Sequence, residues 1–481
     1  MDVNAVALAP EILLVIALCG VLTIDLFLPR EKRWVAMPLS VLGVGATAAA
    51  VLSLWGTEAT TLGGMFVVDR FALLFKLVFC LAAIVVFFIS QDYLREDRIH
   101  MGEYYTMMLS SLLGMLVIAS SRDLIAIFVA LELITLPSIV LAGIKKDDLN
   151  SNEAALKFFL FGVLSSALML LGMSLLYGIT GETALVEISA ALAANEGATE
   201  IAMLATFFVV VGFGFKISAF PFQWWVPDTY EGSPVPVAAF LSVLSKTAGF
   251  VALLQIMFIG LGSLADLWAP VFGLLGVITM TFGNLVALQQ THIVRLLAYS
   301  SIAQAGYIML PLGVASATDA SLNETVVLAT VTYLLIYAFM EIGAFAVAVV
   351  AGRRDGSYLI GDYAGMFTRS PAIAVAMTVF LMSLAGIIPL AGFWAKFMVF
   401  RAVIEGGGLW LGVALALNTV LALFYYAAVS KTMFMDRSDR TDRVSLTLKL
   451  RGVVTALAVA VVVLGVLPGV ITDLATGSHF F

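Results

Sequence analysis

Four ionisable side chains lie far inside apolar stretches of the sequence, and their chemistry depends on where those stretches place them. Glu132, Lys216, Lys246 and Glu341 lie about 10 to 17 residues into their predicted helices. At about 1.5 Å per residue, a side chain at that depth does not easily reach either membrane surface. An ionised group near the centre of a bilayer is costly, and such residues commonly serve transport. We therefore expect these four to face a polar interior, where the structural alternative is a static ion pair or a satisfied polar contact.

Other charges within or beside the apolar stretches have simpler explanations available. Lys396 lies near the predicted end of its helix and could extend to the surface, so a functional and a structural role both stay open. Glu153 and Lys157 have the favourable i, i+4 order at a helix start, which predicts a plain helix pair. Asp25 and Lys76 lie within two turns of predicted helix ends, so we expect them to be solvated or to face a partner.

Prolines interrupt three of the apolar stretches close to these charges. Pro221 follows Lys216 and Pro389 precedes Lys396, while Pro137 follows Glu132. A proline inside a helix leaves one carbonyl without its hydrogen bond, and lipid cannot satisfy that carbonyl, whereas a polar neighbour or water can. The pattern predicts broken helices beside hydrated cavities, most strongly at Pro221 and Pro389. A simple packing kink is the alternative at each proline.

The composition indicates the elements that must position these residues. Of 481 residues, 62% are hydrophobic and 12% charged, and the mean hydropathy is +1.07, values typical of an all-α polytopic membrane protein. The first apolar run lacks a basic leader and a small-residue cleavage pattern, so we expect it to be a retained helix. Runs long enough to span a bilayer predict fourteen helices. They are expected at about 10–29, 34–55, 70–91, 103–120, 123–143, 153–180, 200–223, 235–262, 267–290, 293–315, 324–351, 371–402, 408–434 and 448–474.

The basic residues are distributed unequally between the breaks that separate these helices. Of the 25 lysines and arginines, 17 fall in breaks after odd-numbered helices and three in breaks after even-numbered ones. Because cytoplasmic loops carry the excess of basic residues, the odd breaks are predicted to face the cytoplasm. Both termini are then expected on the opposite side, the periplasm of a bacterial inner membrane.

The sequence offers no pattern typical of a redox cofactor, a metal or nucleic acid. Cys19 and Cys80 lie apart in apolar runs, and His100, His292 and His479 fall in breaks or in the tail, so no haem, iron–sulfur or zinc spacing occurs. The net charge is −7, and no basic face predicts nucleic-acid binding. We therefore expect no cofactor and no metal in this chain.

Several stretches together resemble one known family. They are "SNEAALKFFLFGVLSSALMLLG", "FGFKISAFPFQWWVPDTYEGSPVPVAAFLSVLSKTAGF", "RLLAYSSIAQAGYIML" and "SLAGIIPLAGFWAKF". They resemble the antiporter-like membrane subunits of respiratory complex I, the proton-pumping NADH:quinone oxidoreductase. Within that family, "WVPDTYEGSP" differs from the related L and M subunits, and Lys396 stands where M subunits tend to carry glutamate.

The resemblance implies a fold and a role for each matching residue. The fold would be one transmembrane domain, 1–481: helices at about 10–91, inverted five-helix repeats at about 103–262 and 267–434, and a final helix at about 448–474. The seventh and twelfth helices would be broken. Glu132 would pair with Lys216, Lys246 would be the central relay, and Lys396 would serve the second half-channel. Glu341 lies outside the matching motifs and is a candidate on depth alone.

These roles suggest a proton relay driven by chemistry elsewhere. Desolvation lowers the proton affinity of a buried lysine and a nearby carboxylate restores it, so separating Glu132 from Lys216 would send a proton towards Lys246. A pair about 4 Å apart at an effective dielectric near 20 is worth roughly 4 kcal/mol. NADH, FMN, iron–sulfur clusters and quinone would belong to partner subunits of the membrane and peripheral arms, and this chain would contact lipid and conduct protons.

Three other functions stay open on the sequence. The first is the large subunit of a multisubunit sodium/proton antiporter, whose motifs are shared. The second is a structural subunit that anchors a membrane arm without conducting. The third is a solute transporter, although no solute-recognition motif accompanies the buried charges.

Overall fold

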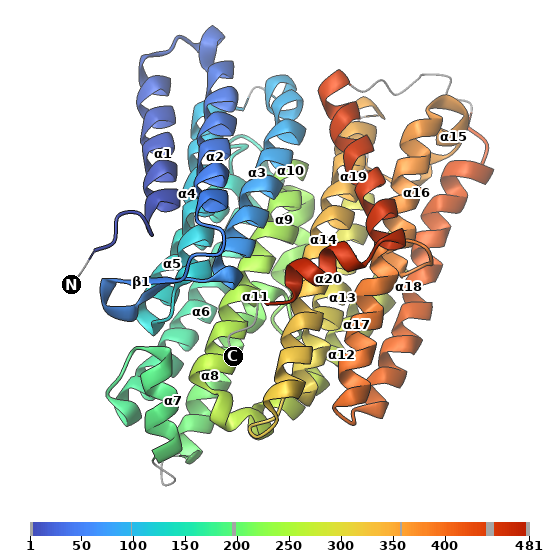
Figure 1. Ribbon diagram of the computed structural model, residues 1–481. Coiled ribbons are helices and arrows are strands. Elements are labelled where there is room, and N and C mark those ends of the chain that lie inside the picture. Colours follow the sequence, from blue (N-terminus) through green and yellow to red (C-terminus); the bar gives the residue numbers. More distant parts are fainter. Residues whose placement is uncertain (1–2, 98, 195–198, 356–357, 439–446, 478–481) are drawn as a thin grey trace.

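The computed structural model describes residues 3–97, 99–194, 199–355, 358–438 and 447–477 as a bundle of roughly parallel and antiparallel helices (Figure 1). The long apolar runs form helices because only a helix satisfies its own backbone hydrogen bonds inside a bilayer. Thirteen helices of the described residues are long and apolar enough to cross a membrane. The helices are α1 (Ala9–Phe27), α2 (Ala36–Ser53), α3 (Arg70–Glu96), α4 (Met101–Ser120), α5 (Leu124–Ala142), α6 (Leu149–Thr180), α7 (Leu185–Ala194), α8 (Thr199–Ile217), α9 (Trp225–Gly232), α10 (Val235–Phe240), α11 (Lys246–Gln255), α12 (Ala265–Ala287), α13 (Ile293–Met309), α14 (Ala320–Asp355), α15 (Met366–Arg369), α16 (Pro371–Ala385), α17 (Ala391–Glu405), α18 (Leu409–Met435), α19 (Leu448–Val466) and α20 (Gly469–Ala475).

The connections between helices alternate between the two ends of the bundle, as the helix count predicts. At one end, Lys145 and Asp97 form an ion pair of 2.6 Å between the break that follows α5 and the end of α3. At the other end, the Arg122 guanidinium lies 2.6 Å from the Asp69 carboxylate, joining the breaks that precede α5 and α3. Breaks after odd-numbered predicted helices therefore meet at one end, and breaks after even-numbered ones meet at the other.

A fourteenth crossing is made by two short helices in series. α16 starts at the end that contains α15, and α17 finishes at the opposite end, where Gly406 and Gly408 lie against Val314. Together α16 and α17 cover the predicted helix 371–402, so the prediction of about fourteen crossings is confirmed. The division into two inverted five-helix repeats stays a prediction.

The two strongest predicted breaks are present, and each lies four residues before its proline. α8 ends at Ile217 rather than at residue 223, and Ser218 takes a left-handed conformation with φ 64°. α16 ends at Ala385, four residues before Pro389. A proline has no N–H for the carbonyl four residues earlier and its ring clashes with that carbonyl, so the helix ends there. The weaker prediction for Pro137 is wrong, because α5 continues through it.

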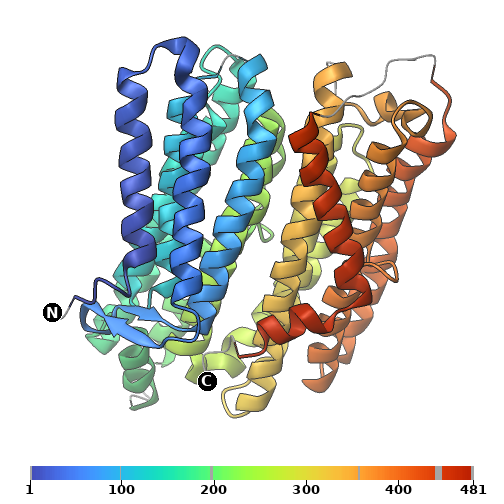
Figure 2. The same cartoon turned by 45° about the horizontal axis from the view of Figure 1, so that its top comes forward.

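Several local features were not apparent from the sequence. A short hairpin, β1 (Ala59–Thr61) with antiparallel β2 (Phe66–Val68), and the helix α7 lie at the same end of the bundle (Figures 1 and 2). The predicted last helix is bent near Pro468 into α19 and α20, and α20 runs across the bundle (Figure 2). Two π-helical segments, η4 (Leu241–Ser245) and η5 (Ile256–Gly260), flank α11. Short 3-10 segments are η1 (Arg30–Val35), η2 (Leu62–Gly64), η6 (Gly262–Leu264), η7 (Leu310–Val314) and η8 (Ile360–Tyr363).

The centre of the bundle is formed by the continuous run α10–η5 together with α13 and α14. In the most apolar window of 235–260, every residue is buried. The buried share of the corresponding windows in 293–314 and 320–352 is 94%, whereas that of α1 is 22%. α1 is therefore peripheral, as Figure 1 shows, whereas the helices that carry Lys246 and Glu341 have no face left for lipid.

Candidate functional site

Lys216 lies in the last turn of α8, directly before the first break. Its side chain is 6% exposed, and its ammonium donates to the carbonyl of Leu131 at 3.4 Å and to the hydroxyl of Thr135, both on α5. The stem of Lys216 also contacts α11, where a Cβ added to Gly249 would lie 3.2 Å from the Lys216 Cβ. The side chain is thus held between two helices, away from lipid.

Glu132 lies on α5, next in sequence to the carbonyl that Lys216 contacts. Its carboxylate is half-buried and accepts a hydrogen bond of 2.5 Å from the Ser166 hydroxyl on α6. No ion pair within 4.0 Å joins Glu132 to Lys216. Glu132 is therefore the neighbour in sequence of a residue that Lys216 contacts, but the two charged side chains do not form an ion pair. Their pairing stays a prediction.

Lys246 and Glu341 occupy the centre of the bundle. Lys246 is the first residue of α11 after the π-helical segment η4, it is 1% exposed, and its ammonium donates to the Ser301 carbonyl of α13 at 2.7 Å. Glu341, on α14, is 0% exposed, and neither carboxylate oxygen has a hydrogen-bond partner. No ion pair within 4.0 Å joins Lys246 to Glu341.

Lys396 lies on α17 and is buried, so it does not extend to the surface as the sequence allowed. It is 5% exposed, and its ammonium donates to the Ala385 carbonyl at 2.9 Å and lies 4.4 Å from the centre of the Tyr307 ring. The Ala385 carbonyl is the one that Pro389 leaves without its helical partner. The break in the predicted twelfth helix therefore supplies the hydrogen-bond acceptor for this buried cation.

A chain of buried polar side chains extends from the centre of the bundle towards Lys396. The Ser300 hydroxyl lies 2.5 Å from that of Tyr426, and the Gln304 amide donates to the Tyr426 hydroxyl and to the Leu384 carbonyl. The Tyr307 hydroxyl, beside Lys396, accepts a hydrogen bond of 3.1 Å from the Asn284 amide. Ser300, Gln304 and Tyr307 lie in the stretch "RLLAYSSIAQAGYIML", which carries the family resemblance, but the sequence assigned them no role because uncharged polar side chains in apolar helices do not by themselves indicate proton chemistry.

A second, more exposed group of charges lies at the end where α6 and α13 begin. Asp228 of α9 accepts from Lys157 at 2.6 Å and from Arg295 at 2.9 Å, and Arg295 also contacts Glu231 at 2.6 Å. Burial raises the pKa of Asp228, but the hydrogen bonds from these two cations outweigh it and hold that pKa below its ordinary value. Lys157 also keeps the predicted pair with Glu153 at 2.7 Å.

Lys76 differs from its prediction as a solvated or partner-facing charge. Its side chain is fully buried, and its ammonium lies 2.7 Å from the Glu11 carboxylate of α1 and 4.6 Å from the centre of the Phe66 ring. A lysine close to a helix end can be buried when another helix supplies a carboxylate, and that partner was not predictable from spacing along the chain.

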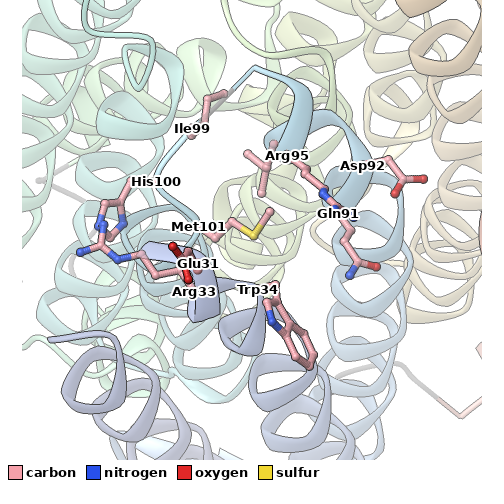
Figure 3. A pocket seen from close by; sticks show the side chains of 10 residues that line it. Glu31, Arg33, Trp34, Gln91, Asp92, Arg95, Ile99, His100 and Met101 are labelled. Carbon is pink, nitrogen blue, oxygen red and sulfur yellow. The ribbon is translucent and has the colours of Figure 1, made fainter. Parts of the chain in front are cut away.

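One cavity of the protein lies away from the buried lysines. It has a volume of about 840 Å³ and opens between η1 and the facing ends of α3 and α4. Figure 3 shows Arg33 beside His100 on one side of it, with Gln91, Asp92 and Arg95 of α3 on the other. Opposite charges line it together, and none of the buried charges at the centre reaches it. In the described ranges, no three His, Cys, Asp or Glu side chains gather as metal ligands would.

Comparison with known proteins agrees with this architecture. Residues 121–422 match the protein family described as NADH:quinone oxidoreductase/Mrp antiporter, TM. The chain is 36% identical over 476 residues to NADH-quinone oxidoreductase subunit N of Trichlorobacter lovleyi, covering 98% of this chain and 96% of that protein. It is 39% identical to the subunit N of Moorella thermoacetica, covering 99% and 98%.

Solved structures share the fold. A chain of respiratory complex I from Thermus thermophilus with bound aureothin aligns with a TM-score of 0.80 at 30% identity, covering 97% of this chain and 100% of that one. A chain of the Mrp complex from Dietzia sp. aligns with a TM-score of 0.87 over 99% and 97%, but at 19% identity, which shows the fold alone. Near-full-length similarity to the subunit N proteins, together with the family match, shows that this chain belongs to the NADH:quinone oxidoreductase subunit N family of antiporter-like membrane proteins.

Proposed function

We propose that this chain conducts protons across the membrane as part of an NADH:quinone oxidoreductase, through Glu132, Lys216, Lys246 and Lys396. One observation carries the proposal: the three buried ammonium groups are each held by a backbone carbonyl, and none has an ion pair within 4.0 Å. A structural lysine in a membrane interior is normally paired with a carboxylate, as Lys76 is with Glu11. Three buried lysines without a carboxylate partner therefore support a conducting path.

The separated arrangement of Glu132 and Lys216 fits one state of a switch. If Glu132 approached to about 4 Å, the attraction would favour the charged Lys216 by roughly 4 kcal/mol at an effective dielectric near 20. Moving one charge against 100 mV requires about 2.3 kcal/mol, so a switch of this size suffices for one proton. In the separated state, the proton of Lys216 is released towards Lys246, and Lys396 delivers a proton to the opposite side.

The energy for this movement comes from partner subunits. NADH, FMN, iron–sulfur clusters and quinone would be bound there, and the other membrane-arm and peripheral-arm subunits would be the partners of this chain. This assignment rests on the chain's scattered cysteines and on the names of its relatives. The test is the purified polypeptide: we expect no NADH oxidation, and a stoichiometric flavin or haem bound to it would contradict the assignment.

The relay is tested by removing each ammonium while keeping most of its volume. We expect Lys216→Met, Lys246→Met and Lys396→Met to assemble and to lose proton pumping measured per quinone reduced in vesicles. Lys431→Met, at an exposed site near the end of α18, is the matched control and should pump normally. Normal pumping by the three buried-lysine variants would instead support a structural anchor.

The sodium/proton antiporter is the less favoured function. Similarity to the Mrp complex extends to the fold alone at 19% identity, whereas the subunit N proteins match at 36% and more over almost the whole length. Repeating the pumping measurement with and without sodium separates the two. Proton movement that requires sodium would favour the antiporter.

A further inference from the structure

Glu341 is a buried charge outside the family motifs, and the relay proposed above gives it no role. Its carboxylate is 0% exposed on α14, and both oxygens lack a hydrogen-bond partner within the protein. Leaving a buried polar group unsatisfied costs about 1–3 kcal/mol, and more when it is charged. Glu341 lies 14 residues before Asp355, the last residue of α14, and its side chain is fully buried.

The connection from Lys246 to the polar chain beside Lys396 has a gap. The ammonium of Lys246 donates to the Ser301 carbonyl, and a carbonyl oxygen can accept a hydrogen bond but cannot pass a proton on. The first hydroxyl groups of the chain, Ser300 and Tyr426, bond to each other. Among the hydrogen bonds of these described side chains, none joins Lys246 to them.

Glu341 lies on the face of α14 that contacts both sides of this gap. Tyr337, one turn before Glu341, donates to the carbonyl of Ser242 at 3.2 Å, and Ser242 lies four residues before Lys246. Tyr333, two turns before Glu341, donates at 2.5 Å to Gln304, whose amide also donates to Tyr426. Residues four apart share one face of a helix, so the Glu341 carboxylate projects from the face that contacts both groups.

We propose that Glu341 carries the proton between Lys246 and the polar chain that leads to Lys396. This inference rests on the proton relay proposed above. The Lys246 ammonium releases one proton and becomes an amine, while the Glu341 carboxylate takes that proton and becomes a carboxylic acid, so the pair stays neutral overall. Glu341 then gives the proton up on the Tyr426 side, and its carboxylate is restored. Lys396 first releases its own proton to the opposite side and becomes an amine, and that amine then takes up the proton that Glu341 gave up. Because Glu341 and Lys246 lie more than 4.0 Å apart, each transfer needs a rotation of a side chain or a bridging water.

A static role for Glu341 predicts a different set of outcomes. If Glu341 only balances the charge of Lys246, then replacing it leaves a buried cation unpaired, which is strongly destabilising. Removing both charges together should then restore assembly. A carrier must in addition alternate between carboxylate and carboxylic acid during turnover, and a static counter-charge does not.

The test uses the whole complex in vesicles and the variants Glu341→Gln and Lys216→Met, with Glu324→Gln as the matched control. Glu324 is an exposed glutamate near the start of the same helix. We expect E341Q to assemble and to reduce protons pumped per quinone to the level of K216M, while E324Q pumps normally. In infrared difference spectra recorded during turnover, we expect a carboxylic-acid carbonyl band that E341Q abolishes and E324Q retains.

The outcomes distinguish failure of the Glu341 role from failure of the proton relay on which it rests. Pumping retained in K216M would overturn the proton relay itself. Pumping lost in K216M but retained in E341Q would overturn only the role of Glu341. If E341Q does not assemble, Glu341→Asp keeps the acid and should retain the infrared band, and its absence in an assembled E341D would refute the carrier. A double variant E341Q/K246M that assembles and pumps would refute it too.

Discussion

Replacing Gly386 by alanine tests whether the break between α16 and α17 fixes the position of Lys396. Gly386 follows α16 directly with φ 91°, a conformation that an L-residue adopts only at a cost of about 1–2 kcal/mol. A Cβ added there would lie 2.9 Å from the Lys396 Cδ, and ordinary contacts are 3.4–4 Å. The stem of the lysine must therefore move by about half an ångström.

That movement changes the contacts of the ammonium. The Lys396 ammonium donates to the Ala385 carbonyl at 2.9 Å and lies over the Tyr307 ring at 4.4 Å. A hydrogen bond from a charged group contributes about 1.5–3 kcal/mol, and a desolvated cation–π contact about 2 kcal/mol. Weakening both by displacement changes the free energy of the charged lysine by about 2 kcal/mol, close to the 2.3 kcal/mol needed per charge against 100 mV.

Gly407→Ala is the matched control for this variant. Gly407 also has a positive φ, 76°, but no atom lies within 4 Å of a Cβ added to it. Both variants share the backbone strain, and only Gly386→Ala displaces Lys396. We expect G386A to pump fewer protons per quinone in vesicles while G407A pumps normally, with assembly checked on native gels. Equal pumping by the two variants would refute the claim that this break positions Lys396.

Three further predictions follow from individual contacts. Glu11→Gln should destabilise the assembled protein by about 3–5 kcal/mol because it leaves the fully buried Lys76 unpaired. Adding Lys76→Met should recover most of the loss in thermal stability. A small loss of stability in E11Q would contradict the buried pair. The pKa of Asp228 is held below its ordinary value of 3.8, so the stability that its carboxylate contributes is complete above that pH and is lost as pH falls through the lowered pKa. The difference in stability between wild type and Asp228→Asn should therefore shrink in acid. A difference that stays constant with pH would contradict this. Tags at both termini should be accessible to protease only from the periplasmic side; a cytoplasmic C-terminal tag would contradict the orientation derived from the 17 to 3 distribution of basic residues.

Much of the fold could be predicted from the sequence because a chain that crosses a bilayer many times must form long apolar helices. Each of the fourteen predicted ranges contains a helix or a broken helix, and their alternation between two ends is confirmed by contacts such as Lys145 with Asp97. The break at Pro221 was expected, but its place was not, since the helix ends at Ile217. That end follows from the missing N–H of Pro221, a rule that acts four residues upstream.

Side-chain partners between helices could not be predicted, because they depend on packing rather than on spacing along the chain. The pairing of Lys76 with Glu11 and the unpaired state of Glu341 both arise where helices distant in sequence meet. The π-helical segment η4 before Lys246 was also missed. It contains neither proline nor glycine, so its extra residue per turn has no local signal, although such segments often lie at functional sites.

The two helix breaks place helix C-terminal ends beside Lys216 and Lys396, neither of which is fixed in an ion pair. α8 and α16 both end inside the bundle, and the C-terminal end of a helix carries a partial negative charge on its unpaired carbonyls. Lys216 lies in the last turn of α8, and Lys396 contacts the last carbonyl of α16. A full carboxylate at 4 Å would hold each proton by roughly 4 kcal/mol, whereas a helix end contributes about 0.3–2 kcal/mol. In the proposed relay, a proton held that weakly is moved by a switch of about 4 kcal/mol, and the prolines that interrupt the helices then contribute to the relay by exposing these helix ends.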